Sequence, residues 1–188
     1  MKKLTEQEII ESVLKGNHGD FALSIDLYKD RAFTLLKKML KNEMDAEEAL
    51  QDSFLKVFNA LSSFKGNSKF STWFYRIVYN TALTIISSKK RKIVMEMSSV
   101  DDHYNLSENE NMIYSQSENQ TEYILNIVDK LPVRNALVII LFYIDGLSLN
   151  EISNVLVISI VNTKVLLHRS RNALRELVIK HNYQEEIL

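Results

Sequence analysis

Apolar residues recur every three or four positions along several stretches of this chain, which is the spacing of an amphipathic helix. The range Phe21–Leu40 predicts one helix, whose apolar face consists of Leu23, Leu27, Tyr28, Leu35, Leu36, Met39 and Leu40. The range Asp45–Leu61 predicts a second helix, with Asp45 as its N-cap. Its apolar stripe consists of Ala46, Leu50, Phe54, Val57 and Leu61, widened by Ala49, Ser53 and Phe58.

A polar loop and a third helix follow. The range Phe64–Ser71 contains Gly, Asn and Ser, which indicates a loop. Ser71 is suited to cap a helix that passes through Trp73 to Ile86. The helix is expected to end in the run SSKKRK that follows Ile86, because basic residues suit a helix C-terminus.

The pattern is lost between residues 93 and 121, where Ser, Asn and acidic residues dominate. This composition is typical of a flexible segment, and a loop of this length is uncommon inside a compact domain. We therefore expect two domains, residues 1–92 and 122–188, joined by an acidic flexible linker of residues 93–121.

The C-terminal domain predicts helices separated by short turns, as in a helix-turn-helix. The expected features are a break at Leu131-Pro132, a helix over Val133–Ile144, a stop at Asp145-Gly146, a helix from a Ser148–Glu151 capping box to Leu156, and a last helix from a Ser159 cap through Ile160 to about Ile179. On spacing alone, a plain helical hairpin fits equally well.

Composition supports an all-α fold of two small helical domains, because the 188 residues include only 4 Gly and 1 Pro. With no Cys, the chain has no disulfide or thiolate site. Its four histidines lack metal-ligand spacing, and no phosphate loop or catalytic motif is present. We expect no metal, no cofactor and no enzymatic activity.

The N-terminus has no apolar run behind its lysines, and no apolar stretch approaches the length of a membrane span of roughly 20 residues. We therefore expect a cytoplasmic protein without membrane insertion.

Charge is strongly segregated, although the net charge is only −1. Residues 53–92 contain 8 basic and no acidic residues, whereas residues 93–129 contain 8 acidic and no basic ones. Residues 130–180 again carry more basic than acidic groups, 7 against 3. Two basic blocks flanking an acidic strip favour contact with a polyanion over an ordinary solvated surface.

The first basic block also contains a cluster of aromatic residues. Phe70, Trp73, Phe74, Tyr75 and Tyr79 are interleaved with Lys65, Lys69 and Arg76. Rings that stack on unpaired bases, with cations along the phosphates, form a platform for single-stranded nucleic acid. The alternative is that the rings are core, which we expect for Trp73 and Phe74. A terminal cluster adds phosphate affinity and consists of Lys89, Lys90, Arg91 and Lys92.

Four segments in register resemble conserved regions two and four of the extracytoplasmic-function (ECF) sigma factors of the bacterial sigma-70 family. They are DAEEALQDSFLKVFNAL, FKGNSKFSTWFYRIVYN, LPVRNALVIILFYIDGLSLNEIS and HRSRNALREL. The resemblance covers residues 19–92 and 130–178. It implies an RNA polymerase sigma factor that binds core polymerase, recognises promoter DNA and melts its minus-ten element.

In the family, the helix that matches Asp45–Leu61 docks on the clamp coiled coil of the large polymerase subunit. The resemblance carries Glu48, Gln51 and Asp52 over as docking residues. Their spacing places them on one helix face, opposite the apolar stripe. Without the resemblance, a solvated helix face is the simpler interpretation.

The loop Phe64–Ser71 resembles the one that captures a flipped base of the minus-ten element. The pocket residues that the resemblance implies are Asn67, Ser68, Lys69 and Phe70, and Asn80 matches a position that reads the same element. The acidic linker resembles the family connector that passes near the polymerase active site.

The C-terminal helices resemble the reader of the minus-thirty-five element, with departures. Val157 stands where the family usually has Gly. In the N-terminal domain, after Asn80, Thr84 and Ser87 also stand where Asp and Arg are common. The expected start of the recognition helix is Ile160, Val161, Asn162 and Val165, of which only Asn162 has a side chain that hydrogen-bonds a base. The residues expected to grip phosphates are Lys164, His168, Arg169, Arg171 and Arg175.

Two other functions stay open from the residues alone. A helix-turn-helix regulator that acts without replacing sigma would use residues 130–180 but leave the basic, aromatic block unused. A helical adaptor would bind a protein through its exposed apolar patch of Ile160, Val161 and Val165. In a sigma factor, the same patch leads us to expect an anti-sigma partner.

Overall fold

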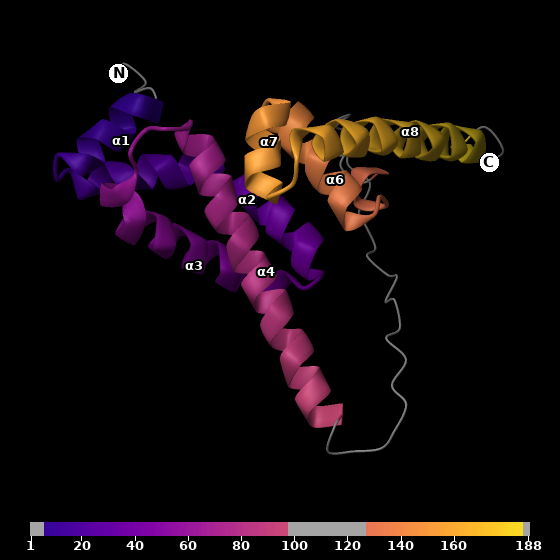
Figure 1. Ribbon diagram of the computed structural model, residues 1–188, viewed down its shortest axis with the longest axis horizontal. Helices are drawn as coiled ribbons and strands as arrows, with labels where there is room; N and C mark the ends of the chain where they lie inside the picture. Colours follow the sequence, from indigo (N-terminus) through magenta and orange to yellow (C-terminus); the bar gives the residue numbers. More distant parts are fainter. Residues whose placement is uncertain (1–5, 98–126, 186–188) are drawn as a thin grey trace.

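The protein folds into helices, as seen in a computed structural model that describes residues 6–97 and 127–185 (Figure 1). An N-terminal domain contains helices α1 to α4, and a C-terminal domain contains α6 to α8. No strand occurs within the described ranges. The expectation of an all-α fold is therefore confirmed.

The N-terminal domain is built from α1 (Glu6–Leu14), α2 (Phe21–Leu40), α3 (Glu43–Ala60) and α4 (Phe70–Met97). An aromatic cluster joins the last three helices. The ring centroid of Phe74 on α4 lies 4.8 Å from that of Tyr28 on α2 and 5.3 Å from that of Phe54 on α3. Since Phe74 is fully buried, this cluster forms the centre of the domain core.

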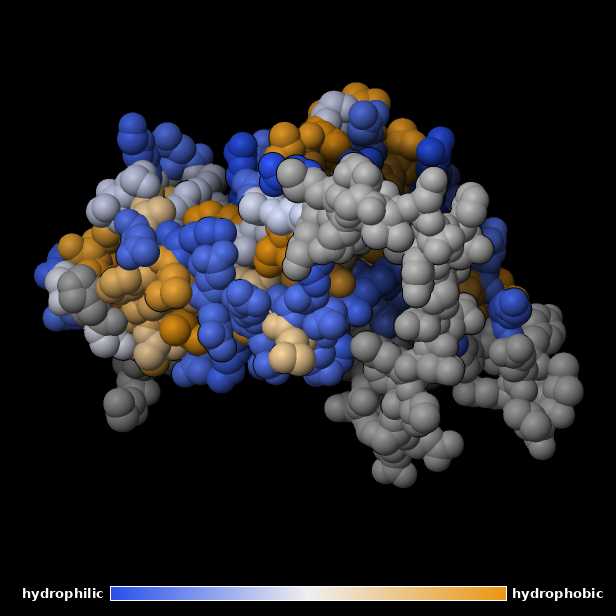
Figure 2. Space-filling view, turned by 90° about the horizontal axis from the view of Figure 1, so that it is seen from below, coloured by the Kyte–Doolittle hydropathy of each residue, from blue (hydrophilic) through white to orange (hydrophobic). Residues whose placement is uncertain are grey.

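Helix α2 has the predicted bounds, and Lys41 ends it in a left-handed conformation. Its buried face includes Tyr28, Leu35 and Leu36 as expected. The prediction was wrong for Leu23 and Leu27, which are 41% and 43% exposed. Figure 2 shows hydrophobic residues gathered at the outer end of this domain, beside a hydrophilic surface.

Helix α3 begins earlier than predicted. Its N-cap is Asn42, whose side-chain oxygen accepts a hydrogen bond from the backbone N–H of Asp45 at 3.0 Å. Asp45 itself lies in the first turn and forms an ion pair with Lys89 on α4. Both residue types are good caps, and the extended backbone of Asn42 decides between them.

Helix α4 is longer than predicted at both ends. It begins at Phe70, so Ser71 is inside the helix and not its cap. It continues past Ile86 to Met97, into the range expected to be linker. The basic residues after Ile86 are good helix formers, which explains why they extend the helix and do not end it.

The C-terminal domain consists of α6 (Val133–Ile139), a π-helical turn (Ile140–Ile144), α7 (Leu149–Leu156) and α8 (Ile160–Glu185). The helix-turn-helix arrangement of α7 and α8 agrees with the prediction. The capping box is present, with Ser148 and Glu151 exchanging hydrogen bonds at 2.7 and 3.3 Å.

The remaining boundaries also follow local rules. Gly146 ends the preceding helix with a positive φ of 66°. The hydroxyl of Ser159 accepts a hydrogen bond from the N–H of Asn162 at 3.2 Å, as expected of a cap. Helix α8 continues past Ile179, where the apolar pattern ends.

The two domains pack against each other. Helix α7 lies beside the first turns of α4, and α6 packs on α2 (Figure 1). Ion pairs join Lys38 to Asp129 at 3.2 Å and Lys69 to Glu151 at 3.1 Å across this interface. The sequence pattern contains no sign of these contacts.

Over the described ranges, no single helix is long and apolar enough to cross a membrane. Only the pair Leu149–Leu156 and Ile160–Lys180, bent by 102°, reaches that length and composition.

Candidate polymerase and promoter interface

A polar face of α3 points away from the core. Glu48 and Gln51 are exposed, and the side chain of Asp52 is 47% exposed. The i, i+3, i+4 spacing holds all three on one side of the helix, opposite the buried Ala49 and Phe54. The structure thus brings together the three residues expected to meet polymerase.

Sequence reasoning missed an apolar member of this face. Leu55 lies one turn after Gln51 and is 63% exposed, although its side chain is large and hydrophobic. An exposed leucine adds apolar area to this otherwise polar face, although single exposed leucines are also common on protein surfaces. The signal was available, because Leu55 falls outside the apolar stripe of α3.

The loop between α3 and α4 presents four of the residues expected to bind DNA. Lys65, Asn67, Ser68 and Lys69 are all exposed, and Gly66 turns the chain with a φ of 69°. A hollow of about 200 Å³ opens here. It is lined by Ser63, Phe64, Lys65, Asn67, Ser68 and Trp73. Its apolar wall and polar rim match the chemistry of a nucleobase, which has a stacking face and a hydrogen-bonding edge.

Phe70 is a correction to the predicted pocket. It is only 4% exposed, with its ring centroid 5.7 Å from that of Phe64 and 5.6 Å from that of Trp73. It therefore supports the hollow from the core side and offers no open face to a base. Trp73, which we expected in the core, is half-buried and lines the hollow.

The other rings do not form an open stacking platform. Phe74, Tyr75 and Tyr79 are 0%, 1% and 6% exposed. The core interpretation holds for them, because these positions of α4 face α2, α3 or the C-terminal domain. The expected platform is thus reduced to Trp73 and its loop.

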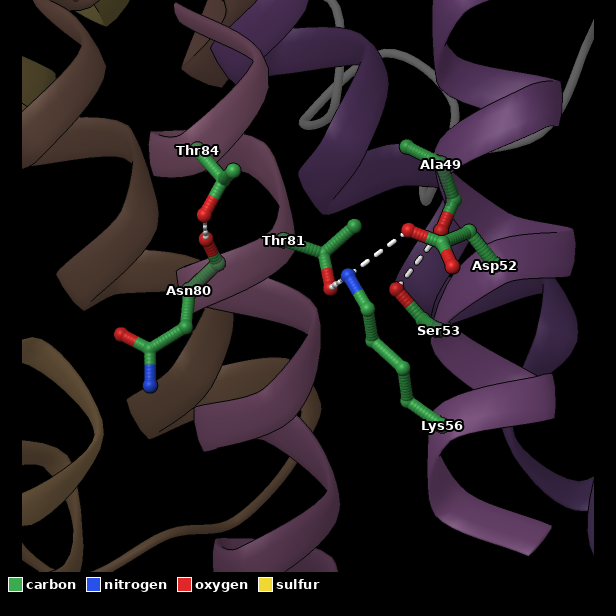
Figure 3. A network of polar contacts seen from close by, with 7 residues as sticks. All are labelled: Ala49, Asp52, Ser53, Lys56, Asn80, Thr81 and Thr84. Carbon is green, nitrogen blue, oxygen red and sulfur yellow. Dashed lines mark hydrogen bonds and ion pairs between the residues drawn. The ribbon is translucent and has the colours of Figure 1, made fainter. Parts of the chain in front are cut away.

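Beyond the loop, α4 exposes Arg76 and Asn80. Asn80 lines an open groove of about 530 Å³ between α3 and α4. Figure 3 shows this groove region, with Lys56 of α3 reaching across to Thr81 of α4. The groove was not foreseen, because its two walls come from different helices.

The basic cluster of α4 is divided. Lys89 is bound to Asp45, while Lys90 and Arg91 are exposed. The side chain of Lys92 lies outside the described residues. A cluster of this kind supplies phosphate affinity that does not depend on base sequence.

On α8, the residues expected at the start of the recognition helix are exposed. Ile160, Val161 and Val165 are 42%, 64% and 42% exposed, and Asn162 is exposed with them. The opposite side of the helix, with Thr163, is buried. The solvent-facing start of α8 therefore contains one amide among three aliphatic side chains.

The basic residues of α8 form a strip beside this start. Lys164, His168, Arg171 and Arg175 follow one another at spacings of four, three and four, and all are exposed. Arg169 is exposed on an adjacent side. Arg171 also has an internal partner, because its Nε donates to the Tyr143 hydroxyl at 2.7 Å.

Comparison with known proteins finds two family regions in the chain. Residues 25–92 match the family description Sigma-70 region 2, and residues 121–174 match Sigma-70, region 4. The chain is 35% identical over 176 residues to the ECF RNA polymerase sigma factor SigW of Bacillus subtilis, covering 89% of this chain and 93% of that protein. The chain belongs to the ECF sigma factors of the sigma-70 family.

Further relatives agree with this assignment. The ECF RNA polymerase sigma-E factor of Escherichia coli K12 is 27% identical over 182 residues, covering 92% of this chain and 94% of that protein.

Two solved structures share the fold. The structure of CnrH in complex with the cytosolic domain of CnrY has a TM-score of 0.61 at 20% identity, covering 92% of this chain and 96% of that one. Sigma factor RpoE in complex with the anti-sigma factor NepR from Bartonella quintana has a TM-score of 0.64 at 22% identity, covering 85% and 96%.

Within this sigma factor, the departure at Val157 has a structural consequence. The residue ends α7 in a left-handed conformation with a φ of 54° and a ψ of 48°. Sigma factors usually carry glycine here, and a β-branched side chain is strained in this conformation. The left-handed conformation of Val157 in the turn between α7 and α8 therefore lowers the stability of the fold.

A buried polar contact joins the two sigma domains. The Tyr75 hydroxyl donates to Oδ1 of Asp145 at 2.6 Å, and Arg31 lies 3.6 Å from the same oxygen. Oδ2 of Asp145 is buried and has no partner within the described residues. Burial raises the pKa of the Asp145 carboxyl, although Tyr75 and Arg31 act in the opposite direction. Burial and the nearby carboxylate raise the pKa of the Tyr75 hydroxyl.

Another interdomain contact joins Lys69 of the α3–α4 loop to Glu151 of α7. Burial alone would raise the pKa of the Glu151 carboxyl, but hydrogen bonds from Ser148 and Lys69 outweigh it and lower that pKa below its usual value. Lys69 keeps 68% of its side chain exposed in this pair. Its partner is thus a weak, solvent-screened one that a phosphate is able to replace.

No cluster of three or more metal-ligating side chains occurs in the part of the chain that the structure describes.

Proposed function

We propose that this ECF sigma factor docks on core RNA polymerase through α3, captures a minus-ten base in the hollow of the α3–α4 loop, and holds the minus-thirty-five element with α8. The observation that carries the proposal is the loop hollow beside Trp73 on the same domain as the acidic face of α3. Polymerase binding and strand capture therefore fall to one rigid unit.

The division of labour follows the matched regions. Residues 1–92 bind polymerase and the minus-ten element, residues 93–121 connect the domains, and residues 122–188 bind the minus-thirty-five element. The described residues form one continuous buried cluster across both groups of helices, so this division rests on the matched regions.

Polymerase docking uses Glu48, Gln51, Asp52 and the newly found Leu55. The proposed partner is the clamp coiled coil of the large subunit. Carboxylates suit a basic partner surface and guide its approach, and the exposed leucine supplies apolar area at the centre.

Strand capture uses the loop. Extruding a base costs a few kcal/mol, and stacking on Trp73 with hydrogen bonds from Asn67 and Ser68 offsets that cost. Lys65, Lys69 and Arg76 contact the adjoining phosphates, and Lys89, Lys90, Arg91 and Lys92 extend the phosphate track.

The C-terminal domain mainly positions the protein on the DNA backbone and discriminates little between base sequences. The basic strip of α8, formed by Lys164, His168, Arg171 and Arg175, together with Arg169, contacts phosphates. Asn162 is the one residue at the exposed start of α8 suited to a bidentate base contact. We expect tolerance for base changes in the minus-thirty-five element.

The exposed Ile160, Val161 and Val165 are the proposed surface for an anti-sigma partner. The solved structures of the same fold are CnrH in complex with the cytosolic domain of CnrY and the sigma factor RpoE in complex with the anti-sigma factor NepR. We expect action in the cytoplasm as a non-enzymatic factor without cofactor or metal. If the protein were a DNA-binding regulator that acts without polymerase, the polar face of α3 and the hollow of the α3–α4 loop would have no binding partner.

Run-off transcription with core polymerase and a library of genomic fragments tests the proposal. The wild-type chain is expected to start RNA at specific sites. Glu48→Lys with Asp52→Lys is expected to abolish core binding and leave the fold intact, because both residues are solvent-exposed. Full core affinity in that double variant, or no initiation by the wild-type chain at any site, would refute the proposed function.

A further inference from the structure

Lys56 connects the polymerase-facing side of α3 to the DNA-facing helix α4. Its Nζ lies 2.7 Å from Oδ2 of Asp52 and donates to the Thr81 hydroxyl at 3.2 Å (Figure 3). Asp52 is one of the proposed docking residues, and Thr81 directly follows Asn80. One ammonium group is therefore shared between the two proposed functions of the domain.

The same lysine lines the groove that contains Asn80. The groove walls are formed by Lys56, Asn59, Ala60, Ile77, Asn80, Thr81 and Thr84. Lys56 is the one charged residue in that described lining, and no acidic residue belongs to it. In Figure 3 the side chains of Lys56 and Asp52 point toward one another while Asn80 projects outward.

In the free chain, the charge of Lys56 is already neutralised. An ion pair at 2.7 Å with a hydroxyl as third partner competes with a phosphate for the Lys56 ammonium group. Both side chains of the pair are 47% exposed, so the pair is weak and easily exchanged for other partners. A basic group of polymerase that binds Asp52 competes directly with Lys56.

We propose that Lys56 couples polymerase docking to promoter binding, an inference that rests on the proposed function. When polymerase takes the carboxylate of Asp52, the freed ammonium of Lys56 holds a promoter-strand phosphate in the groove beside Asn80. Lys56 is thus a further DNA-binding residue that becomes active only in the complex.

The coupling is reciprocal, as any linkage between two binding equilibria must be. A phosphate on Lys56 frees Asp52 for polymerase, so promoter DNA strengthens the docking. In its absence, the Asp52–Lys56 pair weakens each separate interaction, which reduces binding of the free chain to unrelated DNA.

A double-mutant cycle on the full chain without polymerase tests the coupling. The probe is a short single-stranded oligothymidine, because the proposed contact is to phosphate, and affinity is measured by fluorescence anisotropy over a range of salt. Asp52→Asn imitates the polymerase-bound state. We expect it to raise affinity about fivefold and to steepen the salt dependence by about one phosphate, a slope of roughly 0.7.

Lys56→Met is expected to change affinity little in the wild-type chain and to cancel the gain in the Asp52→Asn chain. Lys56→Arg is expected to keep the gain in oligothymidine affinity that Asp52→Asn causes. Glu48→Gln is the matched control, because it removes one carboxylate from the same face, and Glu48 has no ion pair with Lys56. Equal gains for Glu48→Gln and Asp52→Asn, or additive effects of Lys56→Met, would overturn the proposal.

A second measurement separates coupling from loss of structure. In the assembled holoenzyme, Lys56→Met is expected to keep or raise core affinity, because it frees Asp52, and to shorten the lifetime of promoter complexes several-fold. If Lys56 had a purely structural role, Lys56→Met would lower both the core affinity and the lifetime of promoter complexes. The anisotropy cycle needs no polymerase, so its outcome stays distinct from failure of the docking assignment itself.

Discussion

Val157 is a β-branched residue in a left-handed conformation at the centre of the helix-turn-helix. This conformation brings Cβ close to the following carbonyl oxygen and costs roughly 1–2 kcal/mol for a non-glycine residue. The residue is 63% exposed, so its side chain recovers little by burial.

We therefore expect Val157→Gly to raise the free energy of unfolding by about 1 kcal/mol, measured by urea denaturation. Val165→Gly is the matched control, because it removes an exposed valine inside α8 and is expected to lower stability by roughly 0.5–1 kcal/mol. If Val157→Gly lowered the free energy of unfolding as much as Val165→Gly does, the backbone at Val157 would not be strained.

Asp145 makes the stability of the compact chain depend on pH. Its folded-state pKa is raised above the usual value of 3.8, so the folded chain binds the proton more tightly than the unfolded one. Stability from this group is complete below the unfolded pKa and declines as pH rises through the folded pKa.

Asp145→Asn removes that titration and keeps an oxygen that accepts from Tyr75. We expect the wild-type chain to lose stability relative to Asp145→Asn as pH rises from about 4, with a constant difference once the carboxyl is ionised. The lowered pKa of Glu151 acts in the opposite sense in both chains and cancels in the comparison. Parallel curves over the whole range would show that Asp145 does not titrate with folding.

At the scale of elements, α3 presents two surfaces of different composition. One side is buried through Ala46, Ala49 and Val57, and the other exposes Leu55 among polar groups. Since an exposed residue contributes little to folding, its replacement separates binding from stability.

Leu55→Ala is expected to leave the unfolding free energy unchanged within about 0.5 kcal/mol and to weaken core polymerase binding about tenfold. Surface plasmon resonance with immobilised core enzyme gives the affinity. Leu83→Ala on α4 removes a leucine that is 39% exposed and is expected to keep full affinity. Equal affinity of both variants would exclude Leu55 from the docking surface.

At the scale of the whole molecule, the two domains touch through buried and charged groups. The proposed function places these domains on two separate promoter elements. We therefore expect the contacts between the domains to open when both elements are bound.

Tyr75→Phe removes the hydroxyl that hydrogen-bonds the buried Asp145 and keeps the ring in the core. A buried carboxylate without its donor is costly, so we expect the separated form to become more populated. Dyes on Met44→Cys and Lys180→Cys report the interdomain distance by energy transfer, and the native chain contributes no other cysteine.

The control for this prediction is Tyr79→Phe, which removes a hydroxyl of the same helix that makes no contact with Asp145. It is expected to keep the compact distance. If Tyr75→Phe and Tyr79→Phe give the same distribution of interdomain distances, the Tyr75–Asp145 hydrogen bond does not hold the domains together.

Several features that depend on neighbours along the chain followed from the sequence alone, although the N-cap of α3 and both ends of α4 did not. The bounds of α2, the Ser148–Glu151 capping box, the stop at Gly146 and the Ser159 cap all matched. Their hydrogen bonds join residues no more than a few positions apart, so composition and spacing suffice to predict them. The motifs that indicated a sigma factor are local in the same way.

Tertiary structure alone decided which side chains those helices bury or bring together. It placed Phe70 in the core, left Leu23 and Leu55 exposed, and brought Lys56 to Thr81 and Tyr75 to Asp145. The physical reason is that burial and long-range contact depend on what packs against a residue, and the partners here lie up to 70 positions away. Helical periodicity predicts a face, but only the assembled domains determine what covers it.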